Sequence, residues 1–174
     1  MVDYDKIKGG VRSKCTAQGY SDESSWARGQ AWGLYGYTVC YRETKDKRYL
    51  LMADKIHDFI FTNKNMPDDL VPYWDFNAPN IPNEPRDASA AAIIASALYE
   101  LSELGRTEYK ETADKIITSL SSPSYRAILG TNGNFLLMHS VGSIPHGSEI
   151  DVPLNYADYY FLEALNRKLA LEKN

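Results

Sequence analysis

One segment constrains the fold more than any other, because it is apolar on all sides and yet carries an arginine. The run from Ser24 to Tyr37 reads SSWARGQAWGLYGY, and Arg28 is its only charge. A helix that is hydrophobic all round is normally buried. The run therefore predicts an inner helix over about residues 25–42, with Ser24 or Ser25 as its N-cap. Arg28 would be a desolvated cation at the positive end of the helix dipole, and it needs a negative partner.

Two kinds of partner would compensate this arginine. Either a buried aspartate or glutamate pairs with it inside the fold, or the site binds an anion such as a carboxylate. Trp32 falls four residues after Arg28 on the same stripe, which places an aromatic platform beside the cation. An arginine and a tryptophan at the mouth of a helix suit a site for an acidic sugar. Trp26 begins the helix and points away from this stripe, so it belongs to the loop rim or to the core.

Apolar and amphipathic helices alternate along the chain. The apolar ones are predicted near 25–42, 88–99 and 154–166, and the amphipathic ones near 49–60 and 109–120. Such alternation is expected when an inner ring of helices is covered by an outer ring. Antiparallel helical hairpins arranged in this way form an α/α toroid, so the fold class is predicted to be all-α.

The connections point to the same architecture. They are short after the apolar helices, whereas residues 64–87 contain five prolines and residues 130–153 contain four glycines and two prolines. Long loops in a compact domain are usually functional. All of them would lie on one face, at the N-termini of the inner helices, and that face is the predicted site. Residues 1–16 are different and predict a small β-hairpin that turns near Gly9-Gly10.

The chain is too short for a closed ring of helices. Its 174 residues suit a single domain over residues 1–174, but a ring of six helical hairpins needs well over ~200 residues. Five or six helices can be found, including a short one near 124–129, so the chain is predicted to be half a toroid. Half a toroid exposes the inner faces of its apolar helices, which predicts self-association or dependence on a missing segment.

Composition excludes several classes of function. With 23 acidic and 19 basic residues, the chain has no electrostatic case for binding nucleic acid. No apolar run is long enough to span a membrane, and residues 1–10 lack a signal-peptide core. The sequence does not indicate the cellular compartment. Cys15 and Cys40 fit no metal or redox spacing and are predicted to be free thiols. No metal and no cofactor are expected.

Two aspartates are the candidates for acid chemistry. Asp75 lies between Trp74 and Phe76, where desolvation would raise the pKa of its carboxyl and prepare it as a general acid. The alternative for Asp75 is an ordinary turn aspartate. Asp87 precedes an alanine-rich helix and is predicted as its N-cap, a position that would also face the cavity. A glycosidase needs two carboxyls at a defined separation, which the sequence does not fix.

Further polar and aromatic residues are candidates for lining a sugar cleft, namely Gln18, Trp74, His139 and Ser140. Gln18 would hydrogen-bond a sugar hydroxyl or be an ordinary loop residue. A catalytic triad around His139 lacks a nucleophile elbow, and no metal-ligand spacing recurs between His139 and His146. Asp151 is predicted to cap the third apolar helix, with Pro153 in its first turn.

Three motifs in matching order carry a family resemblance. They are QGY at 18–20 with WARGQAW at 26–32, PRDASAA at 85–91, and GSEIDVPL at 147–154 followed by YADYY at 156–160. With these motifs the chain resembles glycoside hydrolase family 88, the unsaturated glucuronyl hydrolases. The resemblance covers nearly all 174 residues, which look like the C-terminal half of the family's domain.

The resemblance implies half of an (α/α)6 barrel acting on oligosaccharides that polysaccharide lyases leave, which carry a 4,5-unsaturated uronic acid at the non-reducing end. In the family an aspartic acid protonates the vinyl ether double bond, water adds at the neighbouring carbon, and the resulting hemiketal opens to release the sugar. Gln18, Arg28 and Trp32 match substrate-site positions of the family, and Trp26 is placed with them. Arg28 would meet the uronate carboxylate or a sulfate on the adjoining sugar.

Two departures from the family pattern bear on activity. The family's catalytic aspartates correspond to positions upstream of residue 1, and Ala17 replaces a histidine that often precedes the Gln-Gly-Tyr motif. The chain is therefore expected to supply the substrate-binding half and to be weak or inactive without an N-terminal half. The alternative is a non-catalytic carbohydrate-binding or helical scaffold module, which would bind saturated and unsaturated uronides equally. The WARGQAW motif argues against an epimerase or another toroidal glycosidase.

Overall fold

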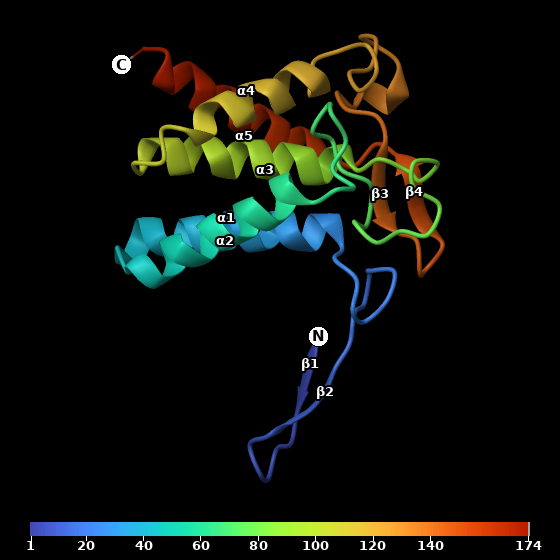
Figure 1. Ribbon diagram of the computed structural model, residues 1–174. Helices are drawn as coiled ribbons and strands as arrows, with labels where there is room; N and C mark the ends of the chain where they lie inside the picture. The colour runs from blue at the N-terminus through green and yellow to red at the C-terminus, as the bar shows by residue number, and fades with distance from the viewer. Residues whose placement is uncertain (174) are drawn as a thin grey trace.

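Five helices carry the fold in the computed structural model, which describes residues 1–173 (Figure 1). They are α1 (Ala27–Thr44), α2 (Lys47–Thr62), α3 (Ala88–Glu103), α4 (Tyr109–Leu120) and α5 (Asn155–Leu171). The three predicted apolar helices correspond to α1, α3 and α5, and the two predicted amphipathic helices to α2 and α4. The existence of all five helices is confirmed.

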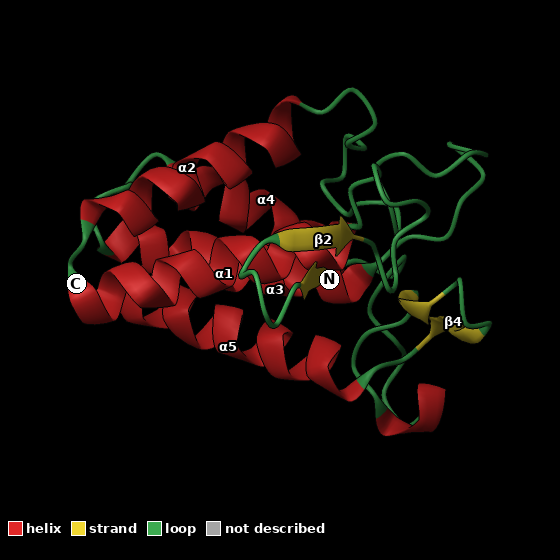
Figure 2. Cartoon of the chain, turned by 90° about the horizontal axis from the view of Figure 1, so that it is seen from below, coloured by secondary structure: helices red, strands yellow, loops and turns green. Residues whose placement is uncertain are grey.

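The helices form two layers around α3. α1 and α5 pack on either side of α3, while α2 covers α1 and α4 covers α3, as Figures 1 and 2 show from two directions. The predicted alternation of inner and outer helices is therefore confirmed. α3 is buried along almost its whole length, since every residue from Ala88 to Ser102 lies in the core.

The two flanking inner helices differ from the prediction that they are buried on all sides. α1 buries a single stripe that runs from Ala27 to Thr38, and α5 buries only Ala157, Phe161 and Ala164. α1 packs on α3 and α2, and its remaining apolar residues are half-buried, whereas α5 packs on α3 and leaves Tyr159, Leu162 and Leu169 exposed. This is the burial pattern of an open half-ring, in which only the central inner helix has neighbours on both sides.

The long connections gather at one end of the helical layers. Residues 15–26, 63–87 and 121–154 lie where α1, α3 and α5 begin, and only short turns join the helices at the other end (Figure 1). The predicted placement of the loops on one face is confirmed. Gly105 follows the end of α3 with a φ of +104°, as expected for a glycine that terminates a helix.

Two antiparallel hairpins complete the fold. The predicted one consists of β1 (Val2–Tyr4) and β2 (Val11–Lys14), and it projects from the helical body with its residues exposed (Figure 1). The other consists of β3 (Ser140–Ser143) and β4 (Ser148–Val152) and was expected to be loop. Its short, irregular strands lack the alternation of apolar and polar residues that identifies a strand in a sequence.

Three local predictions are wrong. The N-cap of α1 is Trp26 rather than Ser24 or Ser25, and no side chain caps this helix. α5 begins at Asn155 after Leu154, so Asp151 is not its N-cap and Pro153 lies before its first turn. Residues 124–129 form turns and irregular chain with an isolated bridge at Arg126 instead of a helix, and the nearby 3-10 helix is Asn132–Asn134.

Two further observations concern the chain as a whole. None of the helices among the described residues has the length and apolar character needed to cross a membrane. Cys15 and Cys40 are both free thiols, as the sequence predicts.

Candidate functional site

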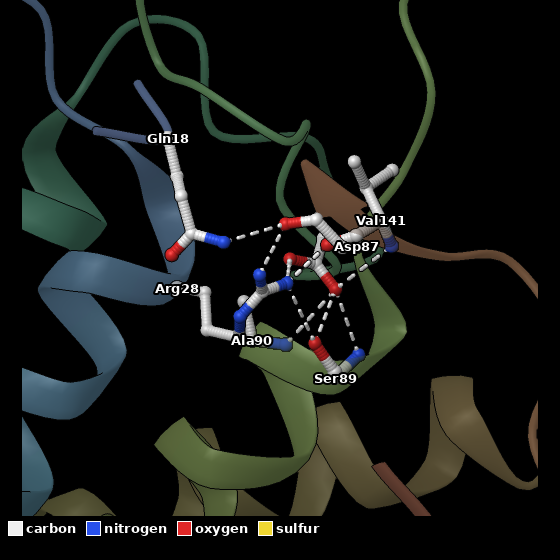
Figure 3. A network of polar contacts seen from close by, with 7 residues as sticks. Gln18, Arg28, Asp87, Ser89, Ala90 and Val141 are labelled. Carbon is white, nitrogen blue, oxygen red and sulfur yellow. Dashed lines mark hydrogen bonds and ion pairs between the residues drawn. The ribbon is translucent and has the colours of Figure 1, made fainter. Parts of the chain in front are cut away.

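The arginine that opens α1 is paired with the aspartate that caps α3. Arg28 Nη1 lies 3.0 Å from Asp87 Oδ2, and the two side chains are 4% and 0% exposed (Figure 3). Of the two partners that the sequence left open, the structure thus shows the internal carboxylate. A buried ion pair of this kind is costly to assemble and strongly destabilising to break, because either partner alone would be a buried unpaired charge.

Asp87 is also bound by the helix that it precedes. Its Oδ1 accepts hydrogen bonds from the Ser89 amide at 3.1 Å, the Ser89 hydroxyl at 2.5 Å and the Ala90 amide at 3.4 Å. The predicted N-cap is therefore confirmed. Burial raises the pKa of Asp87, while Arg28 and the donors at the start of α3 act in the opposite direction. With no exposed atom, this carboxyl is suited to holding structure, and its geometry gives no support to the general-acid role.

Arg28 connects the start of α1 to the β3–β4 hairpin through main-chain oxygens. Its guanidinium donates to the Val141 carbonyl and, at 2.5 Å, to the Gly142 carbonyl. Gln18 Nε2 donates to the same Gly142 oxygen at 3.1 Å (Figure 3). A side chain at residue 142 would meet Glu149, whose Cβ lies 2.6 Å from the place of a Cβ there. All three long connections therefore converge on one arginine.

The aromatic neighbours of Arg28 differ from those expected. Its Cζ lies 4.8 Å from the ring centroid of Trp26 and 5.4 Å from that of Tyr156, both within cation–π range. Trp32 instead packs edge-on against Tyr160, with ring centroids 5.2 Å apart. The prediction that Trp26 points away is wrong, because this N-cap residue has non-helical dihedral angles and a helical projection does not apply to it.

Asp75 joins two of the loops from a fully buried position. Its Oδ2 accepts from the Tyr20 amide at 2.9 Å and the Ser24 hydroxyl at 2.7 Å, and its Oδ1 accepts from the Asn77 amide at 2.8 Å. This is the turn aspartate that the sequence left as the alternative. The neighbouring Trp74 is 3% exposed, and its indole N–H donates to Glu84 at 2.9 Å.

The last two candidates, His139 just before β3 and Ser140 at the start of β3, lie beside the start of α3. The His139 carbonyl accepts from the Ala88 amide, and its Nδ1 lies 2.7 Å from Asp151 Oδ1, with both side chains partly exposed. Ser140 is buried, and its Oγ has no hydrogen-bond partner among the described residues. His139 and Asp151 both have positive φ, a backbone conformation that costs free energy outside glycine and often occurs at functional sites.

The structure brings most of the candidate residues to one end of the molecule. Gln18, Trp26, Arg28, Asp87 and the β3–β4 hairpin contact one another, whereas Trp32 lies further along α1. Sequence reasoning missed Tyr156 and the carbonyls of Val141 and Gly142. Tyr156 could have been recognised, because it belongs to the YADYY motif at 156–160. A main-chain carbonyl that accepts a hydrogen bond leaves no signal in the pattern of side chains.

Known proteins of similar sequence and structure come from one group. No family model matches the chain. It is 48% identical over 169 residues to an unsaturated glucuronyl hydrolase of Formosa agariphila, a match that covers 97% of this chain and 42% of that protein. It is 37% identical over 159 residues to an unsaturated chondroitin disaccharide hydrolase of Streptococcus agalactiae, covering 87% of this chain and 39% of that one.

Solved structures agree with the sequence matches. The crystal structure of an unsaturated glucuronyl hydrolase specific for heparin superposes with a TM-score of 0.96 at 50% identity, covering 99% of this chain and 47% of that one. The enzyme of Bacillus sp. GL1 gives a TM-score of 0.88 at 30% identity, covering 96% and 45%. The chain thus spans less than half the length of these relatives. It is homologous over almost all of its own length to the unsaturated glucuronyl hydrolases, glycoside hydrolase family 88, and folds as about half of their α/α barrel.

Proposed function

We propose that this chain is the substrate-binding part of a hydrolase that releases 4,5-unsaturated uronic acid from lyase-generated oligosaccharides. The observation that carries the proposal is the match to unsaturated glucuronyl hydrolases at 48% identity over 97% of the chain. Its relatives are named for unsaturated chondroitin disaccharide and for heparin, which are both glycosaminoglycan substrates. We place this chain in the C-terminal half of such a protein, on the order of its motifs.

The proposed site is the end of the inner helices where the three loops meet. The side-chain amide of Gln18 donates a hydrogen bond to the Gly142 carbonyl. Its own side-chain oxygen is therefore left to accept a hydrogen bond from a sugar hydroxyl. Trp26 offers an aromatic face beside Arg28, and His139 offers a polar group just before β3. Trp32, Trp74 and Ser140 stay in the proposal as sequence candidates, although Trp32 lies further along α1 and the other two are buried. Contact between Arg28 and a substrate carboxylate stays a prediction, which has to accommodate the internal partner Asp87.

The chemistry of the reaction assigns roles to groups that this chain does not provide. Hydration of the vinyl ether double bond requires an acid that delivers a proton to carbon and a water molecule that attacks the neighbouring carbon. Asp75 and Asp87 are both fully buried, and both oxygens of each accept hydrogen bonds from groups of the chain itself. We therefore assign the proton donor to the part of the relatives outside residues 1–174, and these residues to binding the uronide.

Loss of the ultraviolet absorbance of the double bond tests this assignment. Residues 1–174 alone are expected to leave unsaturated chondroitin and heparin disaccharides intact. A chimaera that adds the N-terminal part of the Formosa agariphila relative is expected to consume them. Turnover by the purified chain alone contradicts the assignment, and Asp75→Asn and Asp87→Asn then identify the acid. Equal binding of saturated and unsaturated uronides, with no turnover by the chimaera, supports a non-catalytic binding module.

We also propose that residues 1–174 form one domain, whose uncovered inner helices make it either self-associate or depend on a further segment. α5 exposes Tyr159, Leu162 and Leu169 by about half, and α1 carries an apolar hollow beside Trp32 and Tyr37. Apolar surface of this extent on a small chain favours association. Sedimentation should show an average mass that rises with concentration, and a monomer at all concentrations contradicts the proposal.

A further inference from the structure

The guanidinium of Arg28 keeps donors that no group described by the structure uses. Nη1 donates to Asp87 and to the Val141 carbonyl, and Nη2 donates to the Gly142 carbonyl (Figure 3). Each Nη of a guanidinium carries two hydrogens and Nε carries one, so Nε–H and one hydrogen of Nη2 remain. Nε–H and Nη2 lie on the same side of the group, and together they can bind both oxygens of one carboxylate.

The unused Nε–H reaches the surface of the molecule. The buried side-chain nitrogen and oxygen atoms that lack a hydrogen-bond partner among the described residues belong to Glu100 and Ser140. Nε of Arg28 also lacks a partner in that part of the chain but is not one of these buried atoms. It therefore contributes to the 4% of the side chain that is exposed. An anion that arrives from solution meets this edge of the guanidinium.

Contacts other than the one with Asp87 also hold Arg28 in place. Two carbonyls of β3 accept hydrogen bonds from it, and its Cζ lies 4.8 Å from the ring centroid of Trp26. The Trp26 ring itself lies over Gly29, where a Cβ would come within 2.8 Å of the ring. The guanidinium should therefore keep its position when residue 87 carries no charge.

Asp87 balances the charge of Arg28 before any ligand binds. The two side chains are 0% and 4% exposed, and neither has a second ionic partner among the described residues. A uronate at the Nε edge would be a second carboxylate on one buried cation. Like charges a few ångströms apart in a poorly hydrated site repel each other, because water and salt screen them little. Asp87 therefore opposes the binding of a uronate at this edge.

We propose that Asp87 sets the affinity of this site for the uronate by neutralising Arg28 before the sugar binds. Asp87 has no exposed surface, so it acts through Arg28 and does not touch the sugar. The released sugar keeps its carboxylate, and a neutral Arg28–Asp87 pair lets it leave more readily than an unpaired buried cation would. The proposal rests on the proposed function, since it presupposes that an unsaturated uronate binds at Arg28.

A neutral residue at position 87 tests the proposal. Asp87→Ser is the variant of choice, because serine also caps a helix but carries no charge. Residues 1–174 are titrated calorimetrically with an unsaturated uronate disaccharide and with its methyl ester, which has the same ring without the charge. We expect Asp87→Ser to bind the acid roughly tenfold more tightly than the unaltered chain does, and to bind the methyl ester equally well. A purely structural role of Asp87 would weaken the binding of both ligands alike.

Two control variants separate the charge of Asp87 from its other contacts. Ser89→Ala removes a hydroxyl that donates to Asp87 at 2.5 Å but keeps the charge. Asp75→Asn removes the charge of another fully buried aspartate, whose hydrogen bonds come from the loops rather than from Arg28. Both controls should leave the ratio of the two affinities close to that of the unaltered chain. A gain in affinity for the acid in Asp75→Asn as large as that in Asp87→Ser overturns the proposal.

A second variant and a second measurement apply if Asp87→Ser folds poorly. Asp87→Asn keeps the size of the side chain and should show the same gain in affinity for the acid. The acid should also raise the melting temperature of a neutral variant by more than that of the unaltered chain, since it supplies the missing carboxylate. Unchanged or weaker binding of the acid by both neutral variants overturns the proposal, as do equal changes for the acid and the methyl ester.

A saturated disaccharide separates this proposal from the proposed function. Failure of the unaltered chain to prefer the unsaturated over the saturated uronide contradicts the proposed function. That preference, without a gain in affinity for the acid in either neutral variant, contradicts the role of Asp87 alone. Binding of the acid by none of these chains contradicts both.

Discussion

Two ionic clusters lie at opposite ends of the α1–α3–α5 layer, and they are built from different partners. At the loop end, Arg28 binds one carboxylate and two main-chain oxygens. At the far end, Glu100 of α3 binds Arg42 of α1 at 2.7 Å and Arg167 of α5 at 2.5 Å. The first cluster joins helices to loops, whereas the second joins three helices to one another.

The difference shows how the same ionic chemistry serves two purposes. A guanidinium bound to carbonyl oxygens fixes the path of the backbone itself, because a carbonyl oxygen moves only when its backbone moves. A guanidinium bound only to carboxylate side chains fixes the distance between helices without constraining a loop. The Arg42 side chain is 42% exposed, compared with 4% for Arg28, so the far cluster is also the more hydrated of the two.

The largest effect is expected from Asp87→Ala. This change leaves Arg28 buried without a carboxylate and removes the N-cap of α3, which together should lower the free energy of unfolding by about 3–5 kcal/mol. Urea unfolding at pH 7 measures it. Asp87→Asn is the matched control, since it keeps a capping oxygen and should cost less. A loss below about 1 kcal/mol for Asp87→Ala would show that the pair does not hold the loop end together.

A smaller effect is expected from Glu100→Gln at the far end. We expect the free energy of unfolding to fall by about 2 kcal/mol, because both arginines that bind Glu100 keep other partners in the variant. Arg42 reaches water and also Glu43, and Arg167 keeps Glu163 at 3.7 Å. The same urea experiment compares the two ends directly. If Glu100→Gln costs as much as Asp87→Ala, the distinction between a dry and a hydrated cluster is wrong.

A third ionic cluster on the outer surface extends the comparison to pH. Burial opposes ionisation of Asp114, but hydrogen bonds from Lys168, Lys110 and Tyr99 prevail and lower its pKa to about 2 from the ordinary 3.8. A carboxyl whose pKa is lowered by folding stabilises the protein at pH values above its pKa in the unfolded state. This stabilisation is lost as the pH falls through its pKa in the folded state. Because the Asp114 side chain is 30% exposed, we expect its charge to contribute about 1 kcal/mol to the free energy of unfolding at pH 7.

Asp114→Asn tests that expectation. The difference in unfolding free energy between the variant and the unaltered chain should be present at pH 7 and shrink between pH 4 and pH 2. A difference that stays constant over this range would assign the loss to packing or hydrogen bonding rather than to the charge of Asp114.

The smallest effect on stability is expected from Gln18→Ala. Only the hydrogen bond to Gly142 is lost, from a partly buried side chain, so the free energy of unfolding should fall by less than about 1 kcal/mol. Binding of an unsaturated disaccharide should nevertheless weaken severalfold, because the amide that faces the sugar is removed. Calorimetric titration measures this, and unchanged affinity would exclude Gln18 from the binding site.

The sequence predicted the helices well and the site only in part. Apolar periodicity identified all five helices, and the glycine pair identified the first hairpin, since both are local signals. The need of Arg28 for an anion and the N-cap role of Asp87 were each predicted from neighbouring residues. That they satisfy each other depends on how α1 packs against α3, and the residues are 59 positions apart. The β3–β4 hairpin carries no periodic signal, and its carbonyls became visible only in the structure.

The single oxygen of Gly142 that two side chains share has a consequence for the order in which the molecule forms. Its partners Gln18 and Arg28 are 124 and 114 residues away along the chain, whereas α1 meets α2, and α3 meets α4, across a few residues. Contacts between distant positions require closure of a large loop and slow the acquisition of structure. We expect the helical hairpins to assemble early and the loop end to close last, so that only a completely folded chain presents a finished binding surface.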